Sequence, residues 1–354
     1  GRVVRFYCNI KNPDGSAFWG DTRDILRSVV EQTRQKGYTC MIGAECEFYL
    51  FVTDESGEPT TVPFDNGGYL DVYPLDKGEN IRREICICLE EMGIRPETSH
   101  HERGPGQNEV DFKFSDAVTS ADNFITFKQV VKSIAARNGL FASFSPKPLP
   151  DKSGSGLHVN LSLMQNGQNV FRLDDSDNSK TARAFVAGVL KKISEITAFL
   201  NPVPNSYERL GVCEAPKYVS WSHGNRSQLI RIPADSTERM RMELRSPDPA
   251  TNPYLAFALI IAAGFYGIEN GLSLPESINV DLYNADESVI GTLPRLPENL
   301  GHALKLAEKS DFLKNTLGEE VVESFIRLKN VELQTYRRTA DKRAFFLENY
   351  FKVI

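Results

Sequence analysis

The sequence predicts an α+β fold, and three observations lead to that prediction. Segments with apolar residues at helical spacing are separated by short segments in which apolar and polar residues alternate, as in strands with one buried face. Hydrophobic residues make up 41% of the chain, enough to form a sizeable core. No internal repeat or low-complexity linker divides the 354 residues. We therefore expect one large domain over residues 21–354, with a short segment before it.

The N-terminal segment, residues 1–12, is predicted to form a single strand that ends at the turn-forming sequence Asn-Pro-Asp-Gly over residues 12–15. A helix then begins at Asp21 or Thr22, either of which can cap it, and ends at Gly37. A strand is expected to begin near Cys40.

Six further helices are predicted from apolar residues at helical spacing. Their expected bounds are residues 79–92, 120–138, 181–200, 252–271, 300–309 and 319–336. The fourth contains an uncharged apolar run over residues 255–268, which is shorter than the roughly 20 residues that span a bilayer. We interpret it as a buried core helix and expect no membrane partner.

Charge and cysteine content indicate the kind of partner and compartment. The net charge of −6 disfavours attraction to a phosphate backbone, so no nucleic-acid partner is expected. The six cysteines include no C-x-x-C pair, a pattern typical of reduced thiols. The N-terminus has no apolar run of signal-peptide length. These features predict a cytoplasmic location.

Two glutamates stand two positions apart in the predicted strand MIGAECEFYLF. Glu45 and Glu47 therefore project from the same face of the strand. If that face is buried, the two carboxylates need a cation nearby, because an unpaired buried charge is costly. The alternative is a solvated strand face with Cys46 and Phe48 packed inward, which is the more common arrangement for glutamates.

Further candidate ligands lie in two glycine-containing segments. In SHHERGPGQNEVDFKF, a Gly-Pro-Gly turn separates Glu102 from Glu109 and brings them near one another. In KSGSGLHVNLSL, the glycines lead into a strand whose alternation places His158, Asn160 and Ser162 on one face. The alternative for His158 is a purely structural role.

The segment RMRMELRSPDP combines arginines and a glutamate on one predicted strand face. Arg239, Arg241 and Arg245 share that face with Glu243, while the residues between them are apolar. This pattern favours a cavity wall that attracts anions and is backed by the core. A solvated edge strand explains it less well, because the sequence continues directly into the apolar helix near residue 252.

Five glutamates and one histidine together suit hard divalent cations such as Mg²⁺ or Mn²⁺ better than a structural zinc. Arginines beside such metals indicate phosphate. The chain has no G-x-x-x-x-G-K-[ST] loop and no kinase-type catalytic loop. A nucleotide would therefore be held by metals and arginines in another way.

These segments, in this order, resemble the catalytic domain of bacterial-type glutamine synthetase. The motifs that carry the resemblance are GAECEFYLF, GGYLDVYP, SHHERGPGQNEVDF, FSPKPLPDKSGSGLHV, NPVPNSYERLGVCEAP, NRSQLIRIP and RMELRSPDPATNPYLAFA. The resemblance covers nearly the whole chain. It implies a curved, mostly antiparallel sheet with surrounding helices over residues 21–354. It also assigns residues 1–20 to the last strand of the family's N-terminal β-grasp domain.

The resemblance also implies roles for individual residues. It assigns the ligands of one metal ion to Glu47, Glu102 and Glu109, and those of a second to Glu45, His158 and Glu243. It assigns nucleotide contacts to Glu97, Phe114, Ser162 and Arg241, and phosphate contacts to Arg226 and Arg231. It assigns glutamate contacts to Gly154, Arg209 and Arg245, and the ammonium pocket to Tyr69 and Glu214. The residues expected to act in catalysis are Tyr69, Glu214, Arg226 and Arg245.

The activity implied by the resemblance is ligation of glutamate and ammonia to form glutamine. ATP would convert the side-chain carboxylate of glutamate to γ-glutamyl phosphate, which ammonia would then attack. The implied partners are glutamate, ammonia and ATP, with two or more Mg²⁺ or Mn²⁺ ions. The implied assembly is a homo-oligomer, the family's dodecamer of two hexameric rings. Two alternatives stay open: a γ-glutamyl ligase for a larger amine, and a metal-binding relative without turnover.

Overall fold

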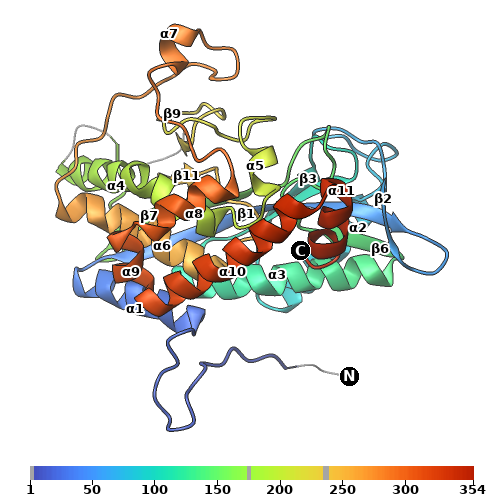
Figure 1. The fold of residues 1–354 in the computed structure, drawn as a ribbon, viewed down its shortest axis with the longest axis horizontal. Helices are drawn as coiled ribbons and strands as arrows, with labels where there is room; N and C mark the ends of the chain where they lie inside the picture. The colour runs from blue at the N-terminus through green and yellow to red at the C-terminus, as the bar shows by residue number, and fades with distance from the viewer. Residues whose placement is uncertain (1–3, 174–176, 234–238) are drawn as a thin grey trace.

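The computed structural model of the chain describes residues 4–173, 177–233 and 239–354, and its main feature is one curved sheet with helices around it (Figure 1). The strands along the main path of the sheet follow the order β3-β4-β1-β7-β11-β10-β9. Their bounds are β3 Pro96–His101, β4 Gln107–Phe112, β1 Thr39–Thr53, β7 Leu157–Gln165, β11 Met242–Leu244, β10 Ile230–Ile232 and β9 Trp221–His223. Each neighbouring pair is antiparallel except β9 and β10, so the expected mostly antiparallel sheet is confirmed.

Four short strands complete the described part of the sheet. They are β2 Pro59–Pro63, β5 Ser115–Asp116 and β6 Leu140–Ser143, which pair with β1, and β8 Gln168–Asn169, which pairs with β7. The strand β1 is thus the longest and most connected element of the sheet. Along it, Ala44, Cys46 and Phe48 are buried in the core. Glu45 and Glu47 therefore lie on the opposite face, as their spacing predicts.

The seven helices predicted from the sequence are all present. Their bounds are α1 Thr22–Gln35, α2 Glu79–Glu91, α3 Ala117–Arg137, α4 Asp177–Leu200, α6 Pro253–Glu269, α8 Leu300–Glu308 and α10 Glu319–Arg338. Asp21 caps α1 by accepting hydrogen bonds from the backbone N–H groups of Arg23 and Asp24. The sequence did not predict several short helical elements, because they span too few turns to show a period. These are α5 Ser206–Arg209, α7 Glu287–Ile290, α9 Asp311–Leu317, α11 Lys342–Phe346 and the π-helical turn η2 Leu347–Phe351.

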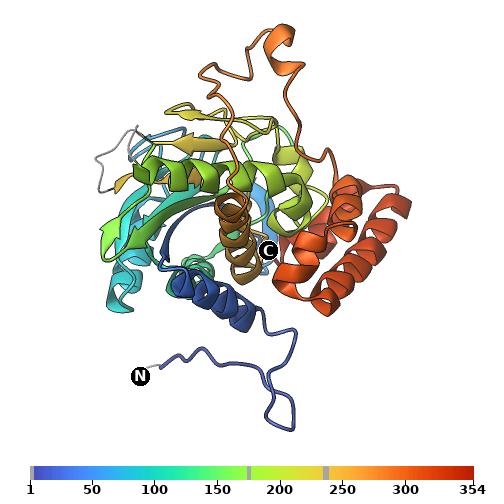
Figure 2. The ribbon, with the colours of Figure 1, turned by 90° about the vertical axis from the view of Figure 1, so that its left-hand side faces the viewer.

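The core lies between one face of the sheet and the helices. In Figure 2 the strands curve around α6, and α4 lies alongside it. Almost the whole of α6 is buried, because it packs against α1, α3, α4 and α9. The expected core helix is therefore confirmed. Among the described residues, none of the helices is long and apolar enough to cross a membrane.

The strand predicted over residues 1–12 is wrong for the part that the structure describes. Residues 4–10 form an extended arm without strand pairing, and Lys11 makes only an isolated bridge to Ala17. The turn at residues 12–15 is present, with the Gly15 N–H donating to the Asn12 carbonyl. A strand needs a hydrogen-bonded neighbour, and no described segment of this chain lies beside the arm as one.

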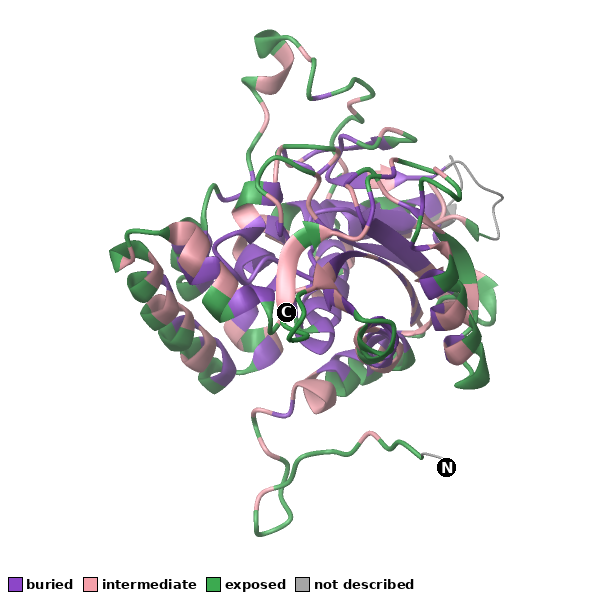
Figure 3. Ribbon diagram, turned by 90° about the vertical axis from the view of Figure 1, so that its right-hand side faces the viewer, coloured by how far each residue is buried: buried purple, intermediate pink, exposed green. Residues whose placement is uncertain are grey.

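A second segment projects from the opposite end of the molecule. It connects α6 to α8 and carries α7 at its tip, at the top of Figure 1. Figure 3 shows that this tip and the N-terminal arm are mainly exposed, whereas the strands and the helices packed on them are largely buried.

Candidate active site

A cavity of about 230 Å³ lies on the polar face of the sheet, opposite the core. Its walls come from β1, β3, β4, β7, β10 and β11, from the short helix α5 and from several loops. All six predicted metal ligands line it, together with most of the other predicted site residues. The latter are Tyr69, Gly154, Arg209, Glu214, Arg226, Arg231 and Arg245.

The strand register brings the acidic side chains together in two rows. In one row, His100 on β3 pairs with Glu109 on β4, which pairs with Glu47 on β1. In the adjacent row, Glu45 on β1 lies between Asp111 on β4 and His158 on β7. Directly paired residues of neighbouring antiparallel strands project from the same face. The sheet therefore gathers residues that are far apart in sequence onto one wall of the cavity.

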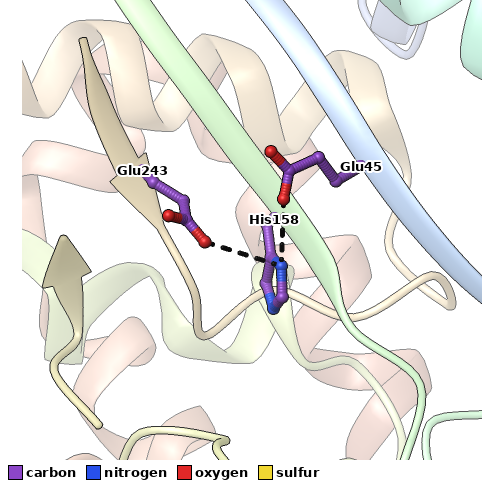
Figure 4. Close-up of side chains that lie close together, drawn as sticks. All are labelled: Glu45, His158 and Glu243. Atoms are coloured by element: carbon purple, nitrogen blue, oxygen red, sulfur yellow. Dashed lines mark hydrogen bonds and ion pairs between the residues drawn. The ribbon is translucent and has the colours of Figure 1, made fainter. Parts of the chain in front are cut away.

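The first candidate metal group is Glu45, His158 and Glu243, whose ligand atoms all lie within 4.8 Å of one another (Figure 4). The Nδ1 atom of His158 lies 3.4 Å from a Glu45 carboxylate oxygen and 3.7 Å from one of Glu243. Burial and the charge of Arg245 lower the pKa of His158 well below its usual value. The imidazole is therefore neutral, which is the form that binds a metal.

Neighbouring side chains fix the orientation of these ligands. Asn160 donates a hydrogen bond of 2.7 Å to Glu45. Arg231 donates to one oxygen of Glu243 at 2.7 Å, and Arg245 pairs with the other oxygen. Such outer contacts are typical of metal ligands, because they hold a carboxylate in one geometry.

The second candidate group is His100, Glu102 and Glu109, which also lie within 4.8 Å through their ligand atoms. The family resemblance assigned Glu47, rather than His100, to this group. Glu47 lies in the same cavity, where its carboxylate accepts hydrogen bonds from Gln107 at 3.0 Å and from the Gly156 N–H at 2.9 Å. His100 was missed, although its alternation with Glu102 along SHHE was a usable signal.

The protonation behaviour of the carboxylates supports a cation-binding site. Burial and the charge of Glu102 raise the pKa of Glu47 to about 7. Burial, and then the charges of Asp111 and Glu47, raise the pKa of Glu109 well above its usual value. Like charges in a buried space disfavour ionisation unless a cation compensates them. The two oxygen-rich donor sets, each with one imidazole, therefore fit two hard divalent ions.

The side of the cavity predicted to bind glutamate depends on a close backbone approach. The buried Arg209 donates hydrogen bonds to the carbonyl oxygens of Arg245, Ser246 and Pro247. A Cβ atom at Gly154 would lie 2.8 Å from Arg209 and 2.4 Å from the carbonyl oxygen of Pro146. Only glycine therefore lets the loop pack against the arginine.

The predicted ammonium side contains Tyr69, Glu214 and Arg226. Arg226 donates to the Tyr69 hydroxyl at 3.3 Å and lies 3.8 Å from one Glu214 oxygen. The other Glu214 oxygen pairs with Arg103 at 2.8 Å. Arg103 was not predicted, because an isolated arginine in a turn carries no periodic signal.

Four residues predicted to contact the nucleotide are not among those that line the cavity: Glu97, Phe114, Ser162 and Arg241. Two of them, Arg241 and Phe114, nevertheless lie beside the same part of the sheet. Arg241 donates a 3.0 Å hydrogen bond to Asn160, and Gly43 approaches both Asn160 and Phe114. The other two residues, Ser162 on β7 and the exposed Glu97 on β3, belong to the same sheet.

The strand predicted around Glu243 is shorter in the structure than in the prediction, since β11 spans only Met242–Leu244.

This fold and site define a metal-dependent enzyme with an arginine-lined cavity for anionic substrates. Residues 19–346 match the family model of the glutamine synthetase catalytic domain. The chain belongs to the glutamine synthetase family.

Several known proteins are similar to the chain. Glutamine synthetase of Clostridium saccharobutylicum is 45% identical over 99% of this chain and 80% of its own length. That of Methanosarcina mazei is 45% identical over 95% of this chain and 76% of its own length. The structure of GmaS with ADP is 32% identical with a TM-score of 0.83, covering 95% of this chain and 79% of that one. The cryo-electron microscopy structure of Plasmodium falciparum glutamine synthetase is 26% identical with a TM-score of 0.82, covering 97% and 81%.

Proposed function

We propose that this protein forms glutamine from glutamate and ammonia, using ATP and passing through γ-glutamyl phosphate. One observation supports the proposal most strongly. The same cavity contains both candidate groups of metal ligands, several arginines and the Glu214 carboxylate. Family membership and the 45% identity to glutamine synthetases support the same activity.

Glu45, His158 and Glu243 would hold one Mg²⁺ or Mn²⁺ ion, and the other ion would be held by Glu102 and Glu109 with Glu47 beside them. When bound, such ions neutralise negative charge on phosphate groups and orient them. The choice between Mg²⁺ and Mn²⁺ is settled by measuring activity with each metal.

The chain's own residues supply binding, orientation and proton transfer. Arg209 and Arg245, with the Gly154 backbone, are proposed to bind glutamate. Arg226 and Arg231 are proposed to counter the charge of the transferred phosphoryl group, which is where electrostatic stabilisation has its largest effect.

The nucleotide is proposed to lie along the sheet surface next to the cavity. The residues that would contact it are Glu97, Phe114, Ser162 and Arg241. The similarity to GmaS, whose structure holds ADP, supports nucleotide binding by this fold. A half-exposed ring such as Phe114 can stack on a base, and the arginine can meet a phosphate.

Ammonium is proposed to enter between Tyr69 and Glu214. The Glu214 carboxylate would attract the cation and accept its proton, because only the neutral amine is nucleophilic. Closure of the segment that carries Glu214 would exclude water, which would otherwise hydrolyse the acyl phosphate.

The test is ATP-dependent phosphate release with glutamate and ammonia, compared with a panel of larger amines. We expect ammonia to give the highest kcat/KM. A preference for a larger amine would change the assignment to a γ-glutamyl ligase of that amine. Absence of turnover with every amine would favour a metal-binding relative without activity.

We further propose the family's assembly and location for this chain. The assembly would be a homo-oligomer of two hexameric rings in the cytoplasm, with residues 21–354 as the catalytic domain and residues 1–20 as the end of a β-grasp domain. Analytical ultracentrifugation of the full-length protein tests the assembly. A stable monomer with full activity would contradict it.

A further inference from the structure

The segment that carries Glu214 has a strained backbone. Besides Gly211 with a φ of 88°, the non-glycine residues Cys213 and Glu214 have φ values of 48° and 67°. Residues other than glycine rarely adopt this left-handed backbone conformation, and it persists only where surrounding contacts impose it. We call residues 211–216 the flap. Its conformation therefore needs anchors outside itself.

The first anchor is Arg103, in the turn between β3 and β4. One of its terminal nitrogens lies 2.8 Å from Glu214 Oε1. Arg226 approaches the other carboxylate oxygen at 3.8 Å, so both oxygens face a guanidinium group. The Arg103 side chain is 52% exposed, and it thus holds Glu214 from the solvent side.

The second anchor is Tyr283, which comes from the projecting segment between α6 and α8. Its hydroxyl donates a 2.6 Å hydrogen bond to the carbonyl oxygen of Ala215. Burial raises the pKa of Tyr283, so the phenol stays protonated and remains a donor. This anchor fixes the flap backbone directly after Glu214.

The projecting segment is itself fastened to the chain that follows the flap. The Val219 N–H donates to Pro294, and the Leu296 N–H donates to Lys217. These backbone contacts fix residues 294–296, at the end of the projecting segment, beside the residues that follow the flap. Next to Tyr283, the Leu282 N–H donates to the Ser227 hydroxyl at 3.0 Å, so the outgoing part of the segment is fastened as well.

We propose that Arg103 and Tyr283 are positioning residues that hold the flap closed over the reaction site and keep water from the acyl phosphate. The inference rests on the proposed function. In the productive step, nitrogen attacks the γ-carbonyl carbon, the bond from that carbon to the phosphate oxygen breaks, and glutamine and phosphate are formed. If the flap opens, a water oxygen attacks the same carbon and returns glutamate and phosphate. The net result is then hydrolysis of ATP to ADP without product.

The experiment compares Arg103→Gln and Tyr283→Phe with the wild-type holoenzyme at saturating ATP, glutamate and Mg²⁺. ADP and glutamine are measured in the same reactions. We expect about one ADP per glutamine in the wild type. Both variants should raise that ratio several-fold and raise the KM for ammonia, while the KM for ATP stays unchanged. A loss of folding alone would lower all rates together and leave the ratio unchanged.

Two further variants sharpen the comparison. Arg103→Lys keeps the cation and should restore a ratio near that of the wild type. Arg83→Gln is the matched control, because it removes an exposed arginine from an ion pair of 3.2 Å with Glu79 on α2, a helix that provides no residue of the cavity. This control should leave the ratio unchanged.

Hydrogen–deuterium exchange of the peptide over residues 211–219 provides a readout that does not depend on activity. Exchange should be faster in both anchor variants and unchanged in Arg83→Gln. Unchanged exchange in the anchor variants would overturn the inference even if the wild type makes glutamine. Faster exchange in a protein that makes no glutamine would instead support the anchors and contradict the proposed function.

Discussion

Glu243 illustrates how the environment sets the role of a single residue. Its side chain is 1% exposed, yet Arg231 pairs with one carboxylate oxygen and Arg245 with the other. A carboxylate buried without such partners would take up a proton. The two arginines therefore compensate the buried charge and hold the carboxylate in one orientation, as a metal ligand needs.

A variant of Glu214 tests whether acyl-phosphate formation and amide formation depend on different residues. Glu214→Ala should leave glutamate-dependent formation of acyl phosphate largely intact, because the metal groups and Arg245 are unchanged. Amide formation should slow by roughly 10²- to 10⁴-fold, the usual contribution of a general base. Rapid-quench measurement of acyl phosphate and glutamine distinguishes the two steps. Wild-type turnover of ammonia by the variant would remove Glu214 from the nucleophile pocket and favour a larger amine as substrate.

Lys128 on α3 should make stability depend on pH. Burial lowers its pKa from the usual 10.5 to about 8, and its amine donates to the Pro249 carbonyl at 2.7 Å. Between pH 8 and 10.5 the unfolded chain keeps a proton that the folded chain has lost. The free energy of unfolding therefore rises with pH across this window, by up to about 3 kcal/mol, and the contribution is lowest below pH 8.

Urea unfolding of the wild type and of Lys128→Met from pH 7 to pH 10 measures this effect. The difference in the free energy of unfolding between the two proteins should increase with pH in favour of the wild type. Taking the difference cancels the cysteines and tyrosines that titrate in the same range. A constant difference would show that Lys128 has an ordinary pKa in the folded chain.

At the scale of elements, the contact between α4 and α6 depends on small residues. A Cβ atom at Gly188 would lie 2.2 Å from the Ala263 carbonyl oxygen and 2.6 Å from the Gly267 nitrogen. Gly267 in turn leaves no space for a Cβ, because the Ala184 carbonyl would lie 1.9 Å away. The two helices thus approach with their backbones in contact.

Gly188→Ala should destabilise the fold by roughly 1–3 kcal/mol, because the clash is with backbone and the helices must separate. Gly301→Ala on α8 is the matched control. Its Cβ would meet only side-chain atoms, of Arg337 at 2.5 Å, Leu333 at 3.2 Å and Asn299 at 3.3 Å, and the closest is the end of a flexible arginine that can move away. Because alanine is also the better helix former, this change should be neutral or slightly stabilising. Thermal unfolding of both variants makes the comparison, and equal midpoints would contradict the proposed backbone contact.

At the scale of the whole molecule, the acidic cavity couples metal binding to stability. The carboxylates repel one another without a cation. A divalent ion at a free concentration of 100 times its Kd should therefore raise the free energy of unfolding by about 3 kcal/mol. Differential scanning fluorimetry should show a higher Tm in Mg²⁺ than in EDTA. The double variant Glu47→Gln with Glu109→Gln should lose the part of this response that comes from the second metal group, because the first group keeps all its ligands. An equal response in that variant would place the bound ions elsewhere.

Local sequence patterns predicted much of the architecture and the site. The helical period identified α1 to α4, α6, α8 and α10, and alternation placed Glu45 and Glu47 opposite the core. The predicted strand at the N-terminus was wrong, because alternation alone does not provide a neighbouring strand. Elements of one or two turns were missed for lack of a detectable period.

Residue type and two-residue spacing in the sequence alone singled out Glu45 with Glu47, and Glu243 with its neighbouring arginines, as candidates for binding a cation or an anion, since they specify chemistry and face. Only the tertiary structure decided which of them meet. Strand register aligned His100 with Glu109 and Glu47, and the flap's left-handed backbone turned Glu214 toward Arg103. Neither arrangement can be deduced from local spacing, because register and strained turns are set by packing between segments far apart in the chain.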